Sequence, residues 1–152
     1  MKPFDEYPNK GNIPLPIPKG TNCRRGYGLD FMRVTKQTHC AYCERIDFTS
    51  SYRAWLEMAL DHVVPVSVCN EHKIPIGWRD SSSNRVLACA ACNSFKNRYR
   101  PSFDFETPVS FEAFLVLRDR IFIQRKELIA QAHREDEAFF NKRPWEEDKR
   151  KT

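Results

Sequence analysis

The stretch "NRVLACAACNSFKNRY", residues 84–99, decides the expected fold, because it reads as a short strand, a turn bounded by two cysteines and the start of a helix. Residues 86–88 form a short apolar run typical of a buried strand, and a short helix is expected from Cys92 onward. Cys89 and Cys92 form a C-x-x-C pair that can supply two thiolates to one metal ion. The stretch therefore predicts a strand-to-helix turn that carries half of a metal site.

A second C-x-x-C pair, Cys40 and Cys43 in "HCAYC", can supply the other half. Two such pairs complete the tetrahedral four-sulfur shell that structural zinc prefers. A closed shell leaves no open position for a substrate, so this zinc is expected to hold the fold rather than to catalyse. Residues 44–88, between the pairs, are too many for a compact zinc ribbon and must have structure of their own. The alternative is two reduced thiol pairs in the core.

The segment "ALDHVVP", residues 59–65, places an acid beside an imidazole between the two cysteine pairs. Alternating apolar residues predict a half-buried strand over residues 56–64, which Pro65 ends. Taken alone, Asp61 and His62 are an ordinary strand exit. Residues 66–83 contain Pro, Gly and a run of three serines, and are expected to form a long loop.

Together these motifs follow one order: C-x-x-C, then D-H-x-x-P, then N-x-V-x-x-C-x-x-C-N-x-x-K. In this order the chain resembles the HNH endonucleases, the ββα-metal nucleases, in their zinc-knuckle form with four cysteines. The resemblance covers roughly residues 38–100. It implies a small ββα-metal core with a four-cysteine zinc knuckle. With a long C-terminal helix and an extended Pro-rich N-terminal arm, which both lie outside the resemblance, the expected fold class is α+β.

The resemblance also implies roles for individual residues. His62 would activate water, which suits an imidazole whose unperturbed pKa is about 6.5. Asn84 would brace the loop and help to orient the base, Lys96 would reach a phosphate oxygen, and Asp61 and Asn93 would ligate the catalytic cation. Many members of the family carry His where this chain has Asn93, so the chain matches the H-N-N variant. An amide and a carboxylate oxygen favour Mg²⁺ or Mn²⁺ over softer ions.

Basic residues are concentrated around the second cysteine pair, although the whole chain is only mildly basic at +5. Five basic residues and one acidic residue fall within positions 79–100: Arg79, Arg85, Lys96, Arg98, Arg100 and Asp80. A solvated face is one interpretation, and a phosphate-binding footprint is the other. We expect DNA as the partner, ahead of RNA, with contacts from Arg85, Lys96, Arg98 and Arg100.

The chain is expected to form one domain with irregular ends. We expect a Pro-rich N-terminal arm over residues 1–22, a nuclease core over 23–105, a helix packed on the core over 106–143, and a charged tail over 144–152. Apolar residues in the helix recur at spacings of three, four and seven. This stripe predicts a core-facing surface, or else a surface for a homodimer or another partner. Thr107 or Ser110 can cap the helix.

Composition suits a globular chain, because 41% of residues are hydrophobic and 30% are charged. No run approaches the length of a membrane span, and the polar N-terminus does not resemble a signal peptide. A cytoplasmic location is therefore the default expectation, and there clustered cysteines more often bind metal than form disulfides. Cys23 and Cys69 are left over. Cys69 and His72 form a C-x-x-H that could bind a second metal, but buried or incidental thiols are the stronger interpretation.

Three function classes fit these motifs to different degrees. The leading one is a metal-dependent HNH endonuclease that nicks or cuts DNA. The alternative is a non-catalytic zinc-binding module that holds nucleic acid or protein, although such a module has no need for Asp61, His62 and Asn93 together. A redox protein that uses C-x-x-C is the weakest, because no thioredoxin-like βαβ pattern surrounds the cysteines.

Overall fold

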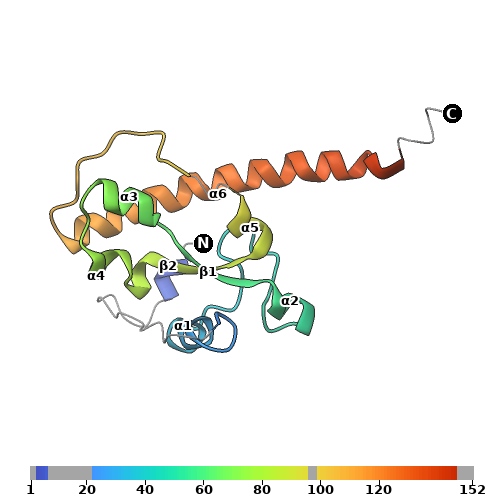
Figure 1. The fold of residues 1–152 in the computed structure, drawn as a ribbon, viewed down its shortest axis with the longest axis horizontal. Helices are drawn as coiled ribbons and strands as arrows, with labels where there is room; N and C mark the ends of the chain where they lie inside the picture. The colour runs from blue at the N-terminus through green and yellow to red at the C-terminus, as the bar shows by residue number, and fades with distance from the viewer. Residues whose placement is uncertain (1–2, 7–21, 96–98, 147–152) are drawn as a thin grey trace.

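The computed structural model of the chain describes residues 3–6, 22–95 and 99–146. Most of the expected Pro-rich arm, Lys96, Arg98 and most of the charged tail lie outside these residues. The described part is α+β: a small two-stranded sheet surrounded by helices, with a long C-terminal helix beside it (Figure 1). The coarse fold class expected from the sequence is therefore confirmed.

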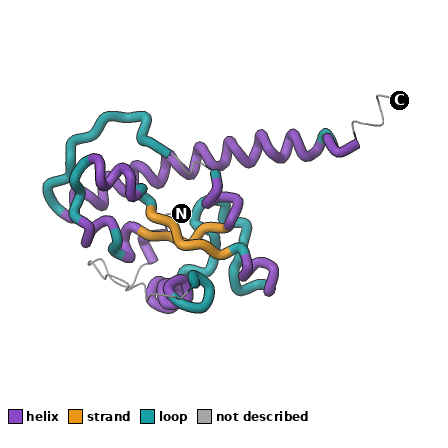
Figure 2. Tube along the Cα trace, in the orientation of Figure 1, coloured by secondary structure: helices purple, strands orange, loops and turns teal. Residues whose placement is uncertain are grey.

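The elements follow one another in an order that places the sheet at the centre of the chain (Figure 2). They are η1 (Pro3–Glu6), α1 (Tyr27–Thr35), α2 (Tyr52–Leu56), β1 (Met58–His62), α3 (Val66–Glu71), α4 (Ile76–Arg79), η2 (Ser82–Asn84), β2 (Arg85–Cys89), α5 (Ala90–Ser94) and α6 (Phe111–Asn141). In Figure 1, α6 runs past one side of the sheet and α1 lies on the opposite side. Among the described helices, none is both long enough and apolar enough to cross a membrane.

Strands β1 and β2 pair antiparallel in a register that brings the main motifs together. Met58 is opposite Cys89, and His62 is opposite Arg85. Helix α5 follows β2 without a break, so Asn93 lies one short turn beyond the last residue of the strand. Both expected strands are confirmed, although β1 is shorter than residues 56–64 because Leu56 ends helix α2 instead.

The long loop expected over residues 66–83 is wrong. This segment folds into α3, α4 and the 3-10 helix η2. Pro65 and Pro75 stand at the N-cap positions of α3 and α4, where a residue without a free N–H is tolerated. Proline and serine here begin short helices rather than keeping the chain extended. The helices fold residues 63–84 into a compact connection that returns the chain to the end of β1.

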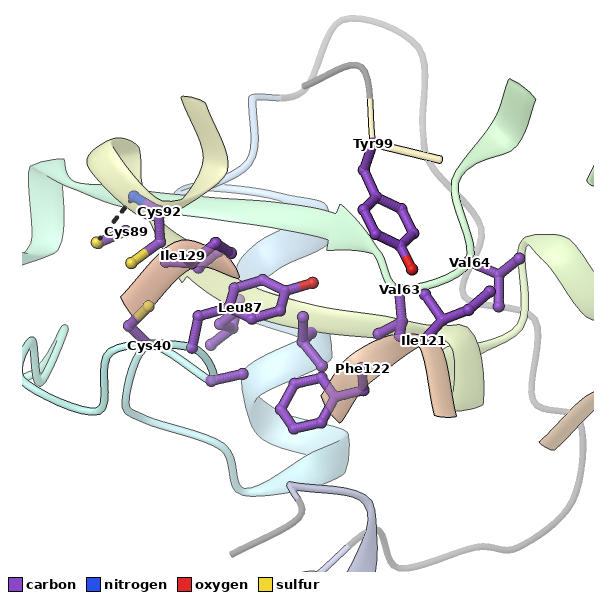
Figure 3. Close-up of a cluster of buried hydrophobic side chains, with 14 of the residues drawn as sticks. Cys40, Val63, Val64, Leu87, Cys89, Cys92, Tyr99, Ile121, Phe122 and Ile129 are labelled. Atoms are coloured by element: carbon purple, nitrogen blue, oxygen red, sulfur yellow. Dashed lines mark hydrogen bonds between the residues drawn. The ribbon is translucent and has the colours of Figure 1, made fainter. Parts of the chain in front are cut away.

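Helix α6 begins where its capping signal predicts. The Ser110 hydroxyl accepts a hydrogen bond from the Ala113 backbone N–H at 3.1 Å, which satisfies one otherwise free donor of the first turn. Four aliphatic and aromatic residues of the expected stripe are fully or almost fully buried: Phe114, Ile121, Phe122 and Ile129. They pack into the same core as Val63, Val64 and Leu87 (Figure 3). The last two turns of the helix leave this core and project from the molecule (Figure 1).

Packing of α6 against the core can be tested with two isoleucines of the same helix. Ile121 is fully buried, whereas Ile123 is 47% exposed. Ile121→Ala is expected to lower the free energy of unfolding by about 2–5 kcal/mol, because it leaves a cavity in the core. Ile123→Ala, the control, is expected to cost less than about 1 kcal/mol. Urea denaturation of both variants measures the difference, and equal losses would contradict the packing of α6.

Candidate functional site

The four C-x-x-C cysteines converge on one point. The Sγ atoms of Cys40, Cys43, Cys89 and Cys92 all lie within 4.8 Å of one another, and Cys43 Sγ is 4.0 Å from Cys89 Sγ. Zinc–sulfur bonds of about 2.3 Å in a tetrahedron separate the sulfurs by about 3.8 Å. The donor set and its spacing therefore fit a metal ion such as zinc. Among the described residues, this is the one group of three or more His, Cys, Asp or Glu side chains with such spacing.

Backbone hydrogen bonds hold the two cysteine pairs together. The Ala41 N–H donates to Leu87 O at 2.9 Å, which ties the first pair to strand β2. Cys89 is the N-cap residue of α5, and its Sγ accepts from the Cys92 N–H at 3.5 Å (Figure 3). Cys43 Sγ accepts from the Arg45 N–H at 3.4 Å. Amide donors favour thiolate ligands, so the local fold suits metal-bound sulfur.

His133 joins helix α6 to this cluster. Its Nε2 lies 3.2 Å from Cys92 Sγ, and its ring packs edge-on against Phe95 with the ring centroids 4.8 Å apart. His133 is half-buried, although the residues that follow it, Arg134 and Glu135, are exposed. The flanking charges point elsewhere because His133 lies on the side of α6 that continues from Ile129, a buried residue one turn earlier.

A second site lies at the end of strand β1. A pocket of about 270 Å³ is lined by Asp61, His62 and Asn93, together with Arg125 from α6, and also by Leu60, Pro65, Val66 and Ser67. The first three are residues that the sequence singled out. Adjacent residues of a regular strand point to opposite faces. Asp61 and His62 nevertheless both line the pocket, because they are the last two residues of β1.

His62 is held by a carboxylate. Its Nε2 lies 3.0 Å from Asp80 Oδ1, and its side chain is 27% exposed. Burial lowers the pKa of His62 below its ordinary value, and the Asp80 hydrogen bond opposes this shift. A carboxylate partner makes Nε2 the donor of a neutral imidazole, which leaves Nδ1 free to accept a proton.

Asp80 is in turn fixed by its neighbour Arg79. The guanidinium donates to both carboxylate oxygens at 2.9 Å, and this pairing lowers the pKa of Asp80 to about 2. The carboxylate therefore stays ionised throughout the neutral range. Sequence reasoning missed Asp80, because it lies within the segment that was expected to be a loop.

Asp61 has two partners, both on its Oδ2 atom. The Tyr42 hydroxyl donates to it at 2.7 Å, and Arg125 Nη1 donates at 2.8 Å. Tyr42 is itself almost fully buried, and burial, together with the nearby Asp61 charge, raises the pKa of its phenol well above the ordinary value. The two hydrogen bonds to Oδ2 thus fix the orientation of the Asp61 carboxylate. Its other oxygen, Oδ1, remains as the candidate metal ligand.

Arg125 is the functional residue that sequence reasoning missed most clearly. Its side chain is only 4% exposed, and Nη1 also reaches His62 O at 2.8 Å and Val63 O at 2.9 Å. One guanidinium therefore holds both the carboxylate and the backbone at the end of β1. The available signal was a charged residue within the apolar stripe of the helix, four residues from both Ile121 and Ile129.

Asn84 holds the backbone of Val64, the residue that follows Val63. Its Oδ1 accepts from the Val64 N–H at 2.9 Å, and its Nδ2 donates to Val64 O at 3.1 Å and to Arg79 O at 2.9 Å. The side chain is fully buried, so these bonds replace its contacts with water. Asn84 braces the connection between β1 and α4, and it does not line the pocket itself.

The expected phosphate contacts have different placements. Arg85 is 3% exposed and its guanidinium lies 3.9 Å from Asp80, so the expectation of a surface contact from Arg85 is corrected: its side chain is inside the protein. Arg100 is exposed and pairs with Glu71 at 2.5 Å. Lys96 and Arg98 lie outside the described residues.

Cys69 and His72 do not form a second metal site in the described structure. Cys69 is fully buried, its Sγ lies 3.8 Å from Val64 O, and burial raises its pKa to about 12. The His72 ring packs against Phe105 instead, at 4.4 Å between centroids. Cys23 packs partly buried against the core, so both remaining cysteines fit the interpretation as structural thiols.

Comparison of the chain with protein-family models, with curated proteins and with solved structures gave no match. Any assignment of activity therefore depends on the two sites themselves. One is a four-sulfur cluster suited to a metal ion, and the other is a polar pocket beside it that contains a carboxyl group, an imidazole and an amide.

Loss of one sulfur ligand is expected to unfold the domain. Cys89→Ser should remove the bound zinc and the cooperative thermal transition together, because structural zinc contributes its binding energy to folding. Cys23→Ser, which lies outside the cluster, is the control and should keep its zinc and its transition. Atomic absorption and circular dichroism measure the two properties. A Cys89→Ser variant that stayed folded without zinc would contradict the structural role.

Removal of the Arg125 guanidinium is expected to destabilise the end of β1. Arg125→Met should lower the free energy of unfolding by about 2–4 kcal/mol, because it leaves the Asp61 carboxylate, which is only 16% exposed, without its charged partner. Adding Asp61→Asn should recover part of this loss, since the unpaired charge is then removed. Arg134→Met, an exposed site on the same helix, is the control. Additive losses in the double variant would show that the two side chains are not coupled.

Proposed function

We propose that this chain is a metal-dependent endonuclease of the HNH type, which hydrolyses phosphodiester bonds in DNA by nicking or by double-strand cutting. The observation that carries the proposal is the shared pocket of Asp61, His62 and Asn93. Asp61 and His62 come from β1, which pairs with β2, and Asn93 comes from the short helix α5, beside a cysteine cluster suited to zinc. This combination agrees with the sequence resemblance to the HNH family.

His62 is the proposed base. Hydrolysis of a phosphodiester needs a group that removes a proton from the attacking water. The Asp80 contact at Nε2 orients the ring and leaves Nδ1 as the acceptor. Because burial lowers the pKa of His62, the imidazole is neutral at neutral pH and can accept that proton. Asp80 acts as a positioning residue for His62 and does not touch the phosphate.

Asp61 and Asn93 are the proposed ligands of the catalytic cation. A carboxylate oxygen and an amide oxygen suit Mg²⁺ or Mn²⁺, which fill their remaining positions with water and phosphate oxygens. Such a cation, when bound, stabilises the charge on the scissile phosphate and on the leaving oxygen. Arg125 donates a hydrogen bond to Asp61 Oδ2 and orients the carboxylate, so Oδ1 is the oxygen that we assign to the metal.

The remaining residues support the substrate or the loop. Asn84 holds the backbone that follows His62, and this matches the bracing role that the resemblance implies. Arg100 is exposed and can contact the DNA backbone once it leaves Glu71. We assign the same role to Lys96 and Arg98. Arg85 is omitted from the proposed DNA surface because its side chain is buried.

A second candidate function is a non-catalytic zinc-binding module that holds nucleic acid or protein. The observation that favours it is that Asp61 and His62 both have partners already: Asp61 pairs with Arg125 and His62 pairs with Asp80. Such pairs also occur in purely structural networks. The two functions differ in whether bound DNA is cut.

Supercoiled plasmid distinguishes these functions. Zinc-loaded wild-type protein is expected to convert the plasmid to nicked or linear DNA with Mg²⁺ or Mn²⁺, but not with Zn²⁺ alone or with chelator present. His62→Ala should lower the rate by at least about 100-fold, since it removes the base, with its thermal transition nearly unchanged. His39→Ala, at an exposed position, is the control. If the wild type and His62→Ala both changed the electrophoretic mobility of the plasmid without cutting it, the binding module would be favoured.

A further inference from the structure

The end of helix α6 presents an aromatic surface that the rest of the described molecule does not cover. Phe139 and Phe140 are each 60% exposed, and Trp145, just after the helix, is 56% exposed. The Phe140 and Trp145 rings pack together at 5.2 Å between centroids. All residues over positions 134–143 are exposed, and this part of the helix projects beyond the core (Figure 1). Exposed aromatic clusters of this kind mark interaction sites.

This surface continues the face by which α6 packs on the core. Five turns of an α-helix take about 18 residues, so residues separated by this interval point in the same direction. Phe139 repeats the direction of Ile121, and Phe140 repeats that of Phe122, and both of these earlier residues are buried. The core-facing stripe therefore runs past the edge of the core and remains apolar there.

The charges on either side of the two phenylalanines have opposite signs. Asp136 lies three residues before Phe139, and Arg143 lies three residues after Phe140. Asp136 also repeats the direction of the buried Arg118, so it lies on the same face as the aromatic rings. Along the chain the order is acid, Phe, Phe, base. If a second copy runs in the opposite direction, the acid of each copy is therefore opposite the base of the other.

We propose that this chain forms a homodimer in which the projecting ends of two α6 helices pair antiparallel. Phe139 and Phe140 of the two copies pack at the centre, and Asp136 of each copy faces Arg143 of the other. Arg143 lies just after the C-cap residue of α6, Lys142. The charge order selects a second copy as the occupant, because the same segment in the reversed direction places acid opposite base at both ends. This interface does not depend on the proposed nuclease activity.

The contact that Arg143 makes within its own chain does not prevent this pairing. Arg143 Nε is 3.0 Å from Glu146, but both side chains are well exposed. Solvent-exposed ion pairs contribute little and exchange readily. Asp136 has no recorded ion-pair or hydrogen-bond partner in the described part of the chain, so its carboxylate is available to a second copy.

The geometry keeps the two cores apart. In this register, position 133 of one copy is opposite position 146 of the other. Because α6 ends at Asn141, the core of each copy lies beyond the end of its partner's helix. The points at which the two helices leave their cores are separated by roughly 20 Å along the common axis. Three aromatic residues per copy bury a small area, which corresponds to a weak interface with a dissociation constant on the order of tens of micromolar.

Sedimentation equilibrium of the full zinc-loaded chain tests the dimer with charge swaps. The wild type should move from the 17.9 kDa mass of one chain toward twice that mass as its concentration rises from about 5 to about 500 µM. Asp136→Arg and Arg143→Asp should each weaken association at least tenfold, because each places like charges opposite one another. The Asp136→Arg, Arg143→Asp double variant and an equimolar mixture of the two single variants should both restore it.

Matched controls make the same charge changes away from the interface. Glu127→Arg and Arg134→Asp lie on other faces of α6, and they should associate as the wild type does. Asp is tolerated at position 143, where φ is 51°. Circular dichroism checks that every variant is folded. A wild type that stays monomeric at the highest concentration would overturn the proposal, as would a double variant no tighter than the single ones.

Discussion

The Arg125 guanidinium at the end of strand β1 is the interaction on which the candidate site depends. It binds the Asp61 carboxylate and the carbonyl oxygens of His62 and Val63 from a position that is almost closed to solvent. Asn84 forms hydrogen bonds with the backbone of the next residue, Val64. The segment that carries the acid and the imidazole is therefore fixed by side chains from two distant parts of the chain. Fixed geometry of this kind is what a catalytic site requires.

Helix α6 connects this strand end with the cysteine cluster. Arg125 reaches the pocket, and His133, about two turns later, reaches Cys92. The cysteine cluster and the polar pocket therefore share one rigid support, although they are built from different residues. A change in the packing of α6 should therefore alter the geometry of both sites. The same helix then leaves the core and presents its exposed aromatic end, which we propose as the surface for self-association.

Local patterns predicted much of this fold. The two strands, the cluster of four cysteines and the capping by Ser110 follow from spacing and from side-chain chemistry. A short helix at Cys92 also follows, although it begins at Ala90, two residues earlier than expected. Long-range contacts could not be predicted in this way. Asp80 reaches His62 only because residues 66–84 fold into short helices, and proline and serine had indicated a loop there. Arg125 and His133 are brought to the sites by the tertiary packing of α6, which a single sequence does not specify.

We propose that Asp61, His62 and Asn93 form a cation-dependent nuclease site. Single-turnover cleavage of an end-labelled duplex, titrated with Mg²⁺ for the wild type and for Asn93→Ala with zinc bound to both, is the decisive measurement. We expect the wild type to cut, and we expect Asn93→Ala to need at least about tenfold more Mg²⁺ to reach half of its maximal rate. Identical Mg²⁺ dependence of the two proteins, or no cleavage by the wild type at any concentration, would contradict it.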